Sequence, residues 1–261
     1  MPMNYARIAV LDVDGVLAPH GEPISKRTRD LLRQIHNYSK IALASGKPAP
    51  YLEGLARGMG LTKTIIIGEN GGVIYLPEEM REIIFQDADR RELMHFKLDL
   101  DKRFNNAIRY QQNMINITIF PNSSISVTEI GDECRKILRR YYLEEDLKLY
   151  IHVDSIDVVP RELDKRWAID RISIALKIPL SRFIAVGDGI NDIGMLSHVK
   201  SHNGTSISVG KNPDVKRSAQ INFDTGLEAL NYILIELEKS SGSLAQKKKD
   251  ERSESDALAF G

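Results

Sequence analysis

The chain has 261 residues, enough for one large domain or two of ordinary size, and 42% of them are hydrophobic, so a sizeable core can form. Its 36 basic and 36 acidic residues cancel, which argues against a nucleic-acid partner and against an anionic membrane surface. The apolar runs are too short for a membrane span, no signal sequence is apparent, and the single cysteine excludes an intrachain disulfide, so we expect a cytoplasmic protein.

The first 76 residues alternate between short apolar runs and amphipathic segments, which is the pattern of a doubly wound α/β sheet. Buried strands are predicted at Ile8–Leu11, Ile41–Ala44 and Ile65–Ile67. Helices are predicted after the capping residue Ser25 and between Pro48 and Gly60. The pair Asn70-Gly71 predicts a hairpin that leads into a fourth strand, Val73–Leu76.

A more polar segment between residues 79 and 159 breaks this rhythm. The elements predicted in it are strand Arg81–Phe85, helix Asp89–Phe104, strands Ile115–Phe120 and Ser124–Glu129, helix Asp132–Leu143, and strands Lys148–His152 and Ile156–Val159. Strands that come in pairs favour a small antiparallel sheet covered by helices. We therefore expect a core domain in two parts, residues 1–78 and 160–239, with a smaller α+β domain inserted over residues 79–159.

The alternation of strand and helix returns after residue 160. The predicted elements are a helix that begins near Lys165, strands Phe183–Val186 and Ser206–Val209, a turn or short helix at Asn212-Pro213, and an amphipathic helix over residues 227–237. Residues 240–261 are rich in serine, lysine and acidic residues, and we expect them to be disordered.

Polar side chains follow four of the predicted core strands at the point where each strand ends. They are Asp12 and Asp14, then Ser45, then Asn70, and finally Asp188, Asn191 and Asp192. Because parallel strands place their carboxyl ends along one edge of an open sheet, we expect these groups to meet there. Carboxylate oxygens suit Mg²⁺, which would also offset the repulsion between the acids. Lys165 opens a helix near the return from the insert, so it can bring a positive charge to the same edge.

The segment Asp12-Val13-Asp14-Gly15-Val16 is also compatible with a solvated acidic turn or with half of a calcium loop. A calcium loop needs an acid at the position of Val16 and lies between helices, whereas an apolar strand precedes this segment. A carboxylate nucleophile, a metal ion and a lysine together describe phosphoryl transfer through an aspartyl-phosphate. A serine or cysteine triad is poorly supported, because His20, His152 and the other histidines are interpreted as surface or packing residues.

Four segments resemble, in order and spacing, the motifs of haloacid-dehalogenase-like phosphatases. They are Asp12-Val13-Asp14-Gly15-Val16, Ser45-Gly46, Lys165, and Gly187-Asp188-Gly189-Ile190-Asn191-Asp192. The resemblance covers about residues 6–77 and 160–237, with an insert where this superfamily carries its cap domain. It implies a Rossmann-like, doubly wound parallel core with an α/β cap. The turn at residues 68–72 and the modest cap are most similar to archaeal-type phosphoglycolate phosphatases.

The resemblance implies a role for each motif residue. Asp12 would be the nucleophile that becomes phosphorylated, and Asp14 would protonate the leaving oxygen and then activate water. The substrate-binding residues would be Ser45, Gly46, Lys165 and Asn191. The Mg²⁺ ligands would be Asp12, Asp14 through its main-chain carbonyl, Asp188 and Asp192. Val16 and Lys47 stand where the family more often has threonine and arginine, and neither change removes an essential oxygen or charge.

These expectations combine into a Mg²⁺-dependent phosphatase, a monomer or homodimer, that acts on a small phosphorylated metabolite. Phosphoglycolate is the first substrate implied by the resemblance, and sugar phosphates of the sucrose-phosphate or mannosyl-phosphoglycerate type are the alternative. A receiver-like phospho-acceptor switch also gathers acids and a lysine around Mg²⁺, but it is much shorter and has no insert. A sensor that binds without hydrolysis is disfavoured because every acid is present. The candidates for reading the leaving group are Arg109, Asn122, Ser123 and Arg161.

Overall fold

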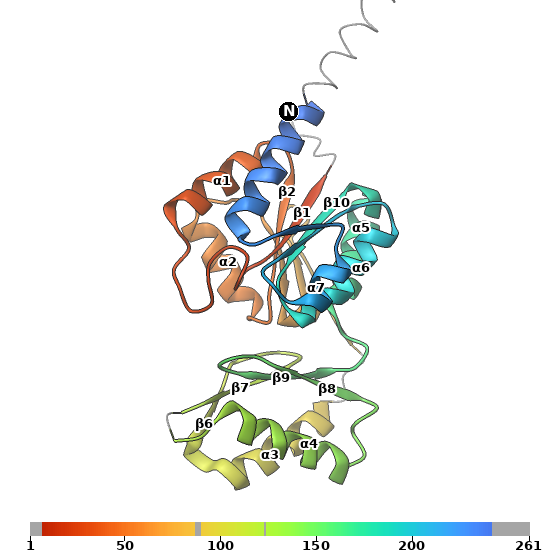
Figure 1. The fold of residues 1–261 in the computed structure, drawn as a ribbon. Helices are drawn as coiled ribbons and strands as arrows, with labels where there is room; N and C mark the ends of the chain where they lie inside the picture. The colour runs from red at the N-terminus through yellow and green to blue at the C-terminus, as the bar shows by residue number, and fades with distance from the viewer. Residues whose placement is uncertain (1–6, 87–89, 123, 242–261) are drawn as a thin grey trace, which may run out of the picture.

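The structure is a computed structural model, and it describes residues 7–86, 90–122 and 124–241. It consists of a large α/β domain and a smaller domain inserted into the middle of the chain (Figure 1). The predicted fold class, a doubly wound parallel-sheet core with a smaller α+β insert, is confirmed. Within the described ranges, no helix combines the length and the apolar character needed to cross a membrane.

Eight strands form the large sheet, in the order β12-β11-β10-β1-β2-β3-β4-β5. Their bounds are β1 Ile8–Asp12, β2 Lys40–Ala44, β3 Ile65–Gly68, β4 Val73–Leu76, β5 Arg81–Ile84, β10 Phe183–Gly187, β11 Thr205–Val209 and β12 Ile221–Phe223. The strands from β12 to β3 run parallel, and β4 and β5 are antiparallel to their neighbours. Strand β1 lies between β10 and β2, so Asp12 is at the middle of the carboxyl edge.

Helices cover both faces of this sheet (Figure 1). One face packs against α1 (Lys26–His36), α2 (Ala49–Gly58) and a final helix over residues 226–241, and the other against α5 (Lys165–Leu176), α6 (Ile193–Ser201) and α7 (Pro213–Ser218). Burial on both faces explains why the core strands are continuous apolar runs rather than alternating ones. Of the predicted disordered tail, residues 240 and 241 close the final helix, and the rest lies outside the described residues.

The small domain has its own antiparallel sheet and its own core. The sheet order is β6-β7-β9-β8, with β6 Ile108–Tyr110, β7 Ile117–Pro121, β8 Leu147–Ile151 and β9 Ile156–Pro160. Helices α3 (Arg90–Phe104) and α4 (Val127–Arg140) cover one face, and Phe96, Ile130 and Cys134 lie in the core between helices and sheet. The other face of the sheet is turned toward the large domain (Figure 1).

Three predictions about the insert are corrected by the structure. Arg81–Ile84 forms a hairpin with β4 and extends the large sheet, so the chain enters the small domain later than predicted. Ser124–Glu129 is not a strand, because Ser126 caps α4 and the helix begins at Val127. A further short strand lies at Ile108–Tyr110, where none was predicted. Short, polar segments show little hydrophobic periodicity, so the elements that they pack against decide which secondary structure they form.

The two domains are joined by a buried carboxylate beside the connecting segments. Glu69, in the turn after β3, accepts hydrogen bonds from the main-chain N–H groups of Met114 (2.8 and 3.0 Å), Ile115 (2.7 Å) and Asn116 (3.2 Å). The side chain of Ile115 also packs against Gly72. Three consecutive N–H groups on one carboxylate therefore anchor the segment that leads into β7.

Candidate active site

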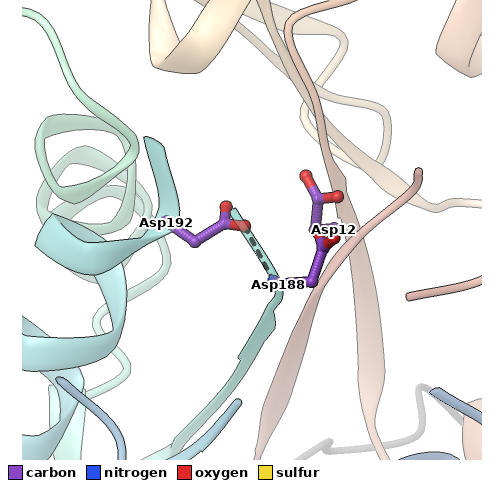
Figure 2. A group of neighbouring side chains, drawn as sticks. All are labelled: Asp12, Asp188 and Asp192. Atoms are coloured by element: carbon purple, nitrogen blue, oxygen red, sulfur yellow. Dashed lines mark hydrogen bonds between the residues drawn. The ribbon is translucent and has the colours of Figure 1, made fainter. Parts of the chain in front are cut away.

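Three carboxylates from two neighbouring strand ends gather at the centre of the carboxyl edge. Asp12 is the last residue of β1, whereas Asp188 and Asp192 belong to the turn after β10. The oxygen atoms that they offer all lie within 4.8 Å of one another (Figure 2). The cluster forms because β1 and β10 are parallel neighbours whose ends coincide, with Leu11 opposite Val186.

Lys165 supplies a positive charge to this cluster. It is the first residue of α5, whose N-cap Asp164 accepts from the main-chain N–H of Trp167, and its side chain is fully buried. The ammonium group donates to Asp12 and, at 2.6 Å, to Oδ1 of Asp192. Burial by itself would lower the pKa of this lysine, but the two carboxylates outweigh it and raise the pKa, so the group is held charged.

The charges of the acids are not balanced by one lysine. Burial raises the pKa of Asp12 well above its usual range; Lys165 opposes this shift, and Asp192 and Asp188 add to it. Burial, together with the charge of Asp192, also raises the pKa of Asp188 to about 6, although the nearby His20 lowers it. A buried cluster of this kind is stabilised by a further cation, and carboxylate oxygens are the ligands that Mg²⁺ prefers. The donor set therefore fits a magnesium ion.

Asp192 also builds the turn that carries Asp188. Its Oδ2 accepts from the main-chain N–H groups of Asp188 and Gly189, at 3.0 Å each, and the first of these bonds is the dashed line in Figure 2. The opposite loop approaches closely: Gly15 has φ +88°, and a Cβ atom there would lie 2.0 Å from Oδ2 of Asp188. Only glycine fits this position. The close approach also brings the loop that carries Gly15 into direct contact with Asp188, so the first and last sequence motifs meet here.

The residues predicted for acid–base catalysis and phosphate binding lie on the neighbouring loops. The carboxylate of Asp14 is half-exposed and pairs with the ammonium group of Lys47. Ser45 directly follows β2, which pairs with β1, and its buried hydroxyl accepts from the main-chain N–H of Lys47 at 3.2 Å. Lys47 was noted in the sequence only as a departure from the family pattern, and the structure pairs it with the predicted acid.

Asn191 is connected to the small domain through a second asparagine. Its Nδ2 donates to Oδ1 of Asn70 at 3.0 Å, and Nδ2 of Asn70 donates to Oδ2 of Asp157 at 2.7 Å. Asp157 lies on β9 and is 3% exposed, so a buried acid of the small domain reaches the edge of the site. Sequence reasoning missed Asp157, and the only available signal was one acid within the apolar strand Ile156–Pro160.

Three of the four residues predicted to read the leaving group have contacts inside the small domain. Asn122 and Arg161 donate to main-chain carbonyls inside the small domain, and the guanidinium of Arg109 lies over the ring of Phe120 at 4.1 Å. Ser123 lies outside the described residues. The histidines that were interpreted as surface or packing residues include two near carboxylates. Nε2 of His20 is 3.3 Å from Asp188, and that of His152 is 3.4 Å from Asp157.

A model of the haloacid dehalogenase-like hydrolases matches residues 9–123 and 86–225, ranges that include all the motif residues described above. The chain belongs to this hydrolase family. The resemblance drawn from the four motifs is thereby confirmed at the level of the superfamily. The hydrolase also carries the insert that the resemblance implied between the second and third motifs.

Two phosphatases and a solved hydrolase structure align with most of this chain. A phosphoglycolate phosphatase from Halobacterium salinarum is 24% identical over 209 residues, which are 80% of this chain and 86% of the relative. An HMP-PP phosphatase from Escherichia coli O157:H7 is 24% identical over 227 residues, covering 75% of this chain and 82% of the relative. A haloacid dehalogenase-like hydrolase from Bacteroides thetaiotaomicron has the same fold, with a TM-score of 0.70 at 19% identity over 87% of this chain and 99% of its own.

Proposed function

We propose that this hydrolase is a Mg²⁺-dependent phosphatase that acts on the phosphomonoester of a small metabolite through an aspartyl-phosphate on Asp12. The observation that carries the proposal is the buried ion pair of Lys165 with Asp12 and Asp192, beside Asp188 at the same strand edge. This arrangement combines a carboxylate nucleophile, a fixed positive charge, and an acidic cluster whose negative charge one lysine does not neutralise. The phosphatase names of the relatives support the same reaction.

In this mechanism a carboxylate oxygen of Asp12 attacks phosphorus while the bond from phosphorus to the leaving oxygen breaks. Asp14 gives its proton to that oxygen and then takes a proton from the water that hydrolyses the acyl phosphate. Lys165 offsets the charge of Asp12 and of the phosphoryl oxygens, which Ser45, Gly46 and Asn191 also hold. Asp12, Asp188 and the main-chain carbonyl of Asp14 would bind Mg²⁺, with Asp192 beside them; when bound, the cation neutralises charge on the phosphoryl group.

Phosphoglycolate is the first substrate that we propose, on the motif resemblance and on the name of the Halobacterium salinarum relative. Sugar phosphates are the second. The choice is tested by a panel of phosphorylated metabolites, with release of inorganic phosphate as the measurement. A kcat/KM for phosphoglycolate that exceeds all others supports the first substrate, and a sugar phosphate at the head of the panel supports the second.

The reaction itself is tested with p-nitrophenyl phosphate, a substrate that needs no specific leaving-group contacts. We expect multiple turnovers in the presence of Mg²⁺ and a loss of activity when a chelator removes it. A single stoichiometric phosphorylation would instead indicate a phospho-acceptor switch, and binding of phosphate without release of product would indicate a sensor.

Replacing the nucleophile gives a specific prediction. Asp12→Asn keeps the shape of the side chain but cannot form the acyl phosphate, so we expect turnover to fall by at least ~10³-fold. The variant should keep the wild-type circular dichroism spectrum. A matched control is Asp170→Asn, which removes a surface acid that is bonded only to His198 in the described structure. Wild-type turnover by Asp12→Asn would refute the assignment.

A further inference from the structure

We propose that Asp157 is a positioning residue for this reaction, because its carboxylate orients the side-chain amides of Asn70 and Asn191 in series when the small domain lies on the core. The inference rests on the proposed function, in which Asn191 holds the phosphoryl group. It assigns a role to a residue of the small domain that, among the described residues, is hydrogen-bonded neither to the acidic cluster nor to Lys165.

Asp157 is buried between the two domains, and its oxygens accept from both. Oδ1 accepts from the hydroxyl of Thr118 at 2.7 Å, within the small domain. Oδ2 accepts from Nδ2 of Asn70 at 2.7 Å, on the core, and Nε2 of His152 lies 3.4 Å away. A buried carboxylate is stable only with such donors, so the core amide is part of what holds Asp157 in place.

The core is shaped to admit this acid. A Cβ atom on Gly46 would lie 2.9 Å from Oδ2 of Asp157 and 3.2 Å from Nδ2 of Asn70. Nε2 of Gln111, also from the small domain, donates to the carbonyl of Gly46 at 3.2 Å. The small domain therefore closes directly on the loop that carries the predicted phosphate-binding residue Ser45.

The hydrogen bonds run in one direction because both oxygens of the Asp157 carboxylate act as acceptors. Asn70 must turn its NH₂ group toward Asp157, so its Oδ1 faces the other way. Asn191 must then present its own NH₂ group to that oxygen. Without Asp157, both amides can rotate by half a turn at little cost. The carboxylate of Asp157, in the small domain, thus decides which side-chain atoms of Asn191 are left free to contact the substrate.

The consequence is that the phosphate site is completed by closure. When the small domain moves away, Asn70 loses the carboxylate that orients it, and Asn191 loses its fixed partner. Coupling of this kind would let chemistry proceed only under the closed small domain, where water is excluded.

The test is a charge-preserving exchange of the two residues. Asp157→Asn and Asn70→Asp are each expected to lower kcat for p-nitrophenyl phosphate by about tenfold or more, since each disrupts a charge-assisted hydrogen bond. The double variant N70D/D157N is expected to recover most of the activity. In it, the new amide at position 157 donates to the new carboxylate at position 70, which still accepts from Asn191. A role in stability alone would not produce this recovery of kcat.

Two further measurements separate positioning from loss of structure. In an Asn191→Ala background, Asp157→Asn should have less than a twofold effect on kcat, because the residue through which it acts is gone. The matched control is Asp154→Asn, which makes the same charge change in the adjacent turn, where Asp154 accepts only from Ser155 in the described structure. It should leave kcat unchanged.

The outcomes distinguish this inference from the proposed function. If the wild-type protein releases no phosphate from any substrate, the proposed function fails and the inference with it. If the wild type turns over but Asp157→Asn does so equally well, or the folded double variant stays as slow as the single ones, the inference alone is overturned. If a single variant does not fold, the double variant carries the test, because it retains every hydrogen bond of the series.

Discussion

At the scale of single residues, the site is defined by an excess of negative charge. Lys165 forms ion pairs with two of the three clustered carboxylates, whereas the carboxylate of Asp188 lies 3.3 Å from Nε2 of His20. The raised pKa values of Asp12 and Asp188 have this origin, together with burial. Repulsion among these carboxylates destabilises the metal-free protein, and the proposed Mg²⁺ would relieve it, so stability and the proposed function oppose each other here.

The variant Asp188→Asn tests this excess of negative charge through the pH dependence of the free energy of unfolding. The pKa of Asp188 is raised from its ordinary value of 3.8 to about 6, so the folded state binds this proton more tightly than the unfolded state. The stability that protonated Asp188 contributes is therefore fully present below about pH 4, and it is lost as the pH rises through 6 and the carboxyl group ionises. In metal-free buffer at pH 7 we expect the variant to be more stable than wild type by up to about 3 kcal/mol. The difference should vanish near pH 4, as measured by urea unfolding.

The same pair of proteins should respond oppositely to magnesium. Wild type should gain roughly 2.7 kcal/mol when Mg²⁺ is present at a hundred times its Kd, because the ion binds only the folded state. Asp188→Asn should gain far less, since it lacks one of the proposed ligands. Equal gains in both proteins would place the cation at another site.

At the scale of elements, the turn between β3 and β4 holds the domains together. It supplies Glu69, which anchors the main chain before β7, and Asn70, which reaches Asp157. Both residues have positive φ, 54° and 56°, in the left-handed region of backbone conformation. A turn that looks in the sequence like a plain hairpin therefore also contacts the small domain.

Glu69→Gln is expected to weaken this junction. The variant replaces a carboxylate oxygen by an NH₂ group that faces main-chain N–H groups, so the free energy of unfolding should fall by about 1–3 kcal/mol. Hydrogen exchange at Met114, Ile115 and Asn116 should accelerate along with it. Glu79→Gln, at an exposed position, makes the same change in charge and serves as the control. Unchanged protection of the three amides would contradict the assigned anchor.

At the scale of the whole molecule, the two domains have separate hydrophobic cores. The chain has one tryptophan and one cysteine, and they report on different domains: Trp167 packs on the core, next to Phe85, and Cys134 lies inside the small domain. Burial, with the neighbouring charge of Glu133, raises the pKa of the Cys134 thiol to about 12, so it is protonated and unreactive in the native state.

We expect the small domain to unfold first in urea. Its core is smaller than the two layers that cover the large sheet, and less apolar surface is buried there. Labelling of Cys134 by a thiol reagent should therefore begin at a lower urea concentration than the change in Trp167 fluorescence. Coincident transitions would show instead that the contacts at the junction make the two domains a single cooperative unit.

The sequence by itself determined the core and most of the predicted site. Buried parallel strands are local features, visible as apolar runs, and the topology of an open sheet then requires their carboxyl ends to meet. The sequence alone therefore predicted that Asp12, Asp188 and Asp192 lie together with Lys165. The insert was less predictable, because Arg81–Ile84 and Ser124–Glu129 are short and polar, and their state depends on a hairpin partner and on a helix cap.

Only the tertiary structure decided how the small domain meets the site. Asn70 and Asp157 are 87 residues apart in the chain, and Glu69 is 45 residues from Met114, so no local pattern joins them. The partner of Lys47, 33 residues away, is hidden for the same reason. A buried polar side chain takes whichever donor or acceptor the packing of two domains brings to it, and that packing depends on all of their surfaces at once.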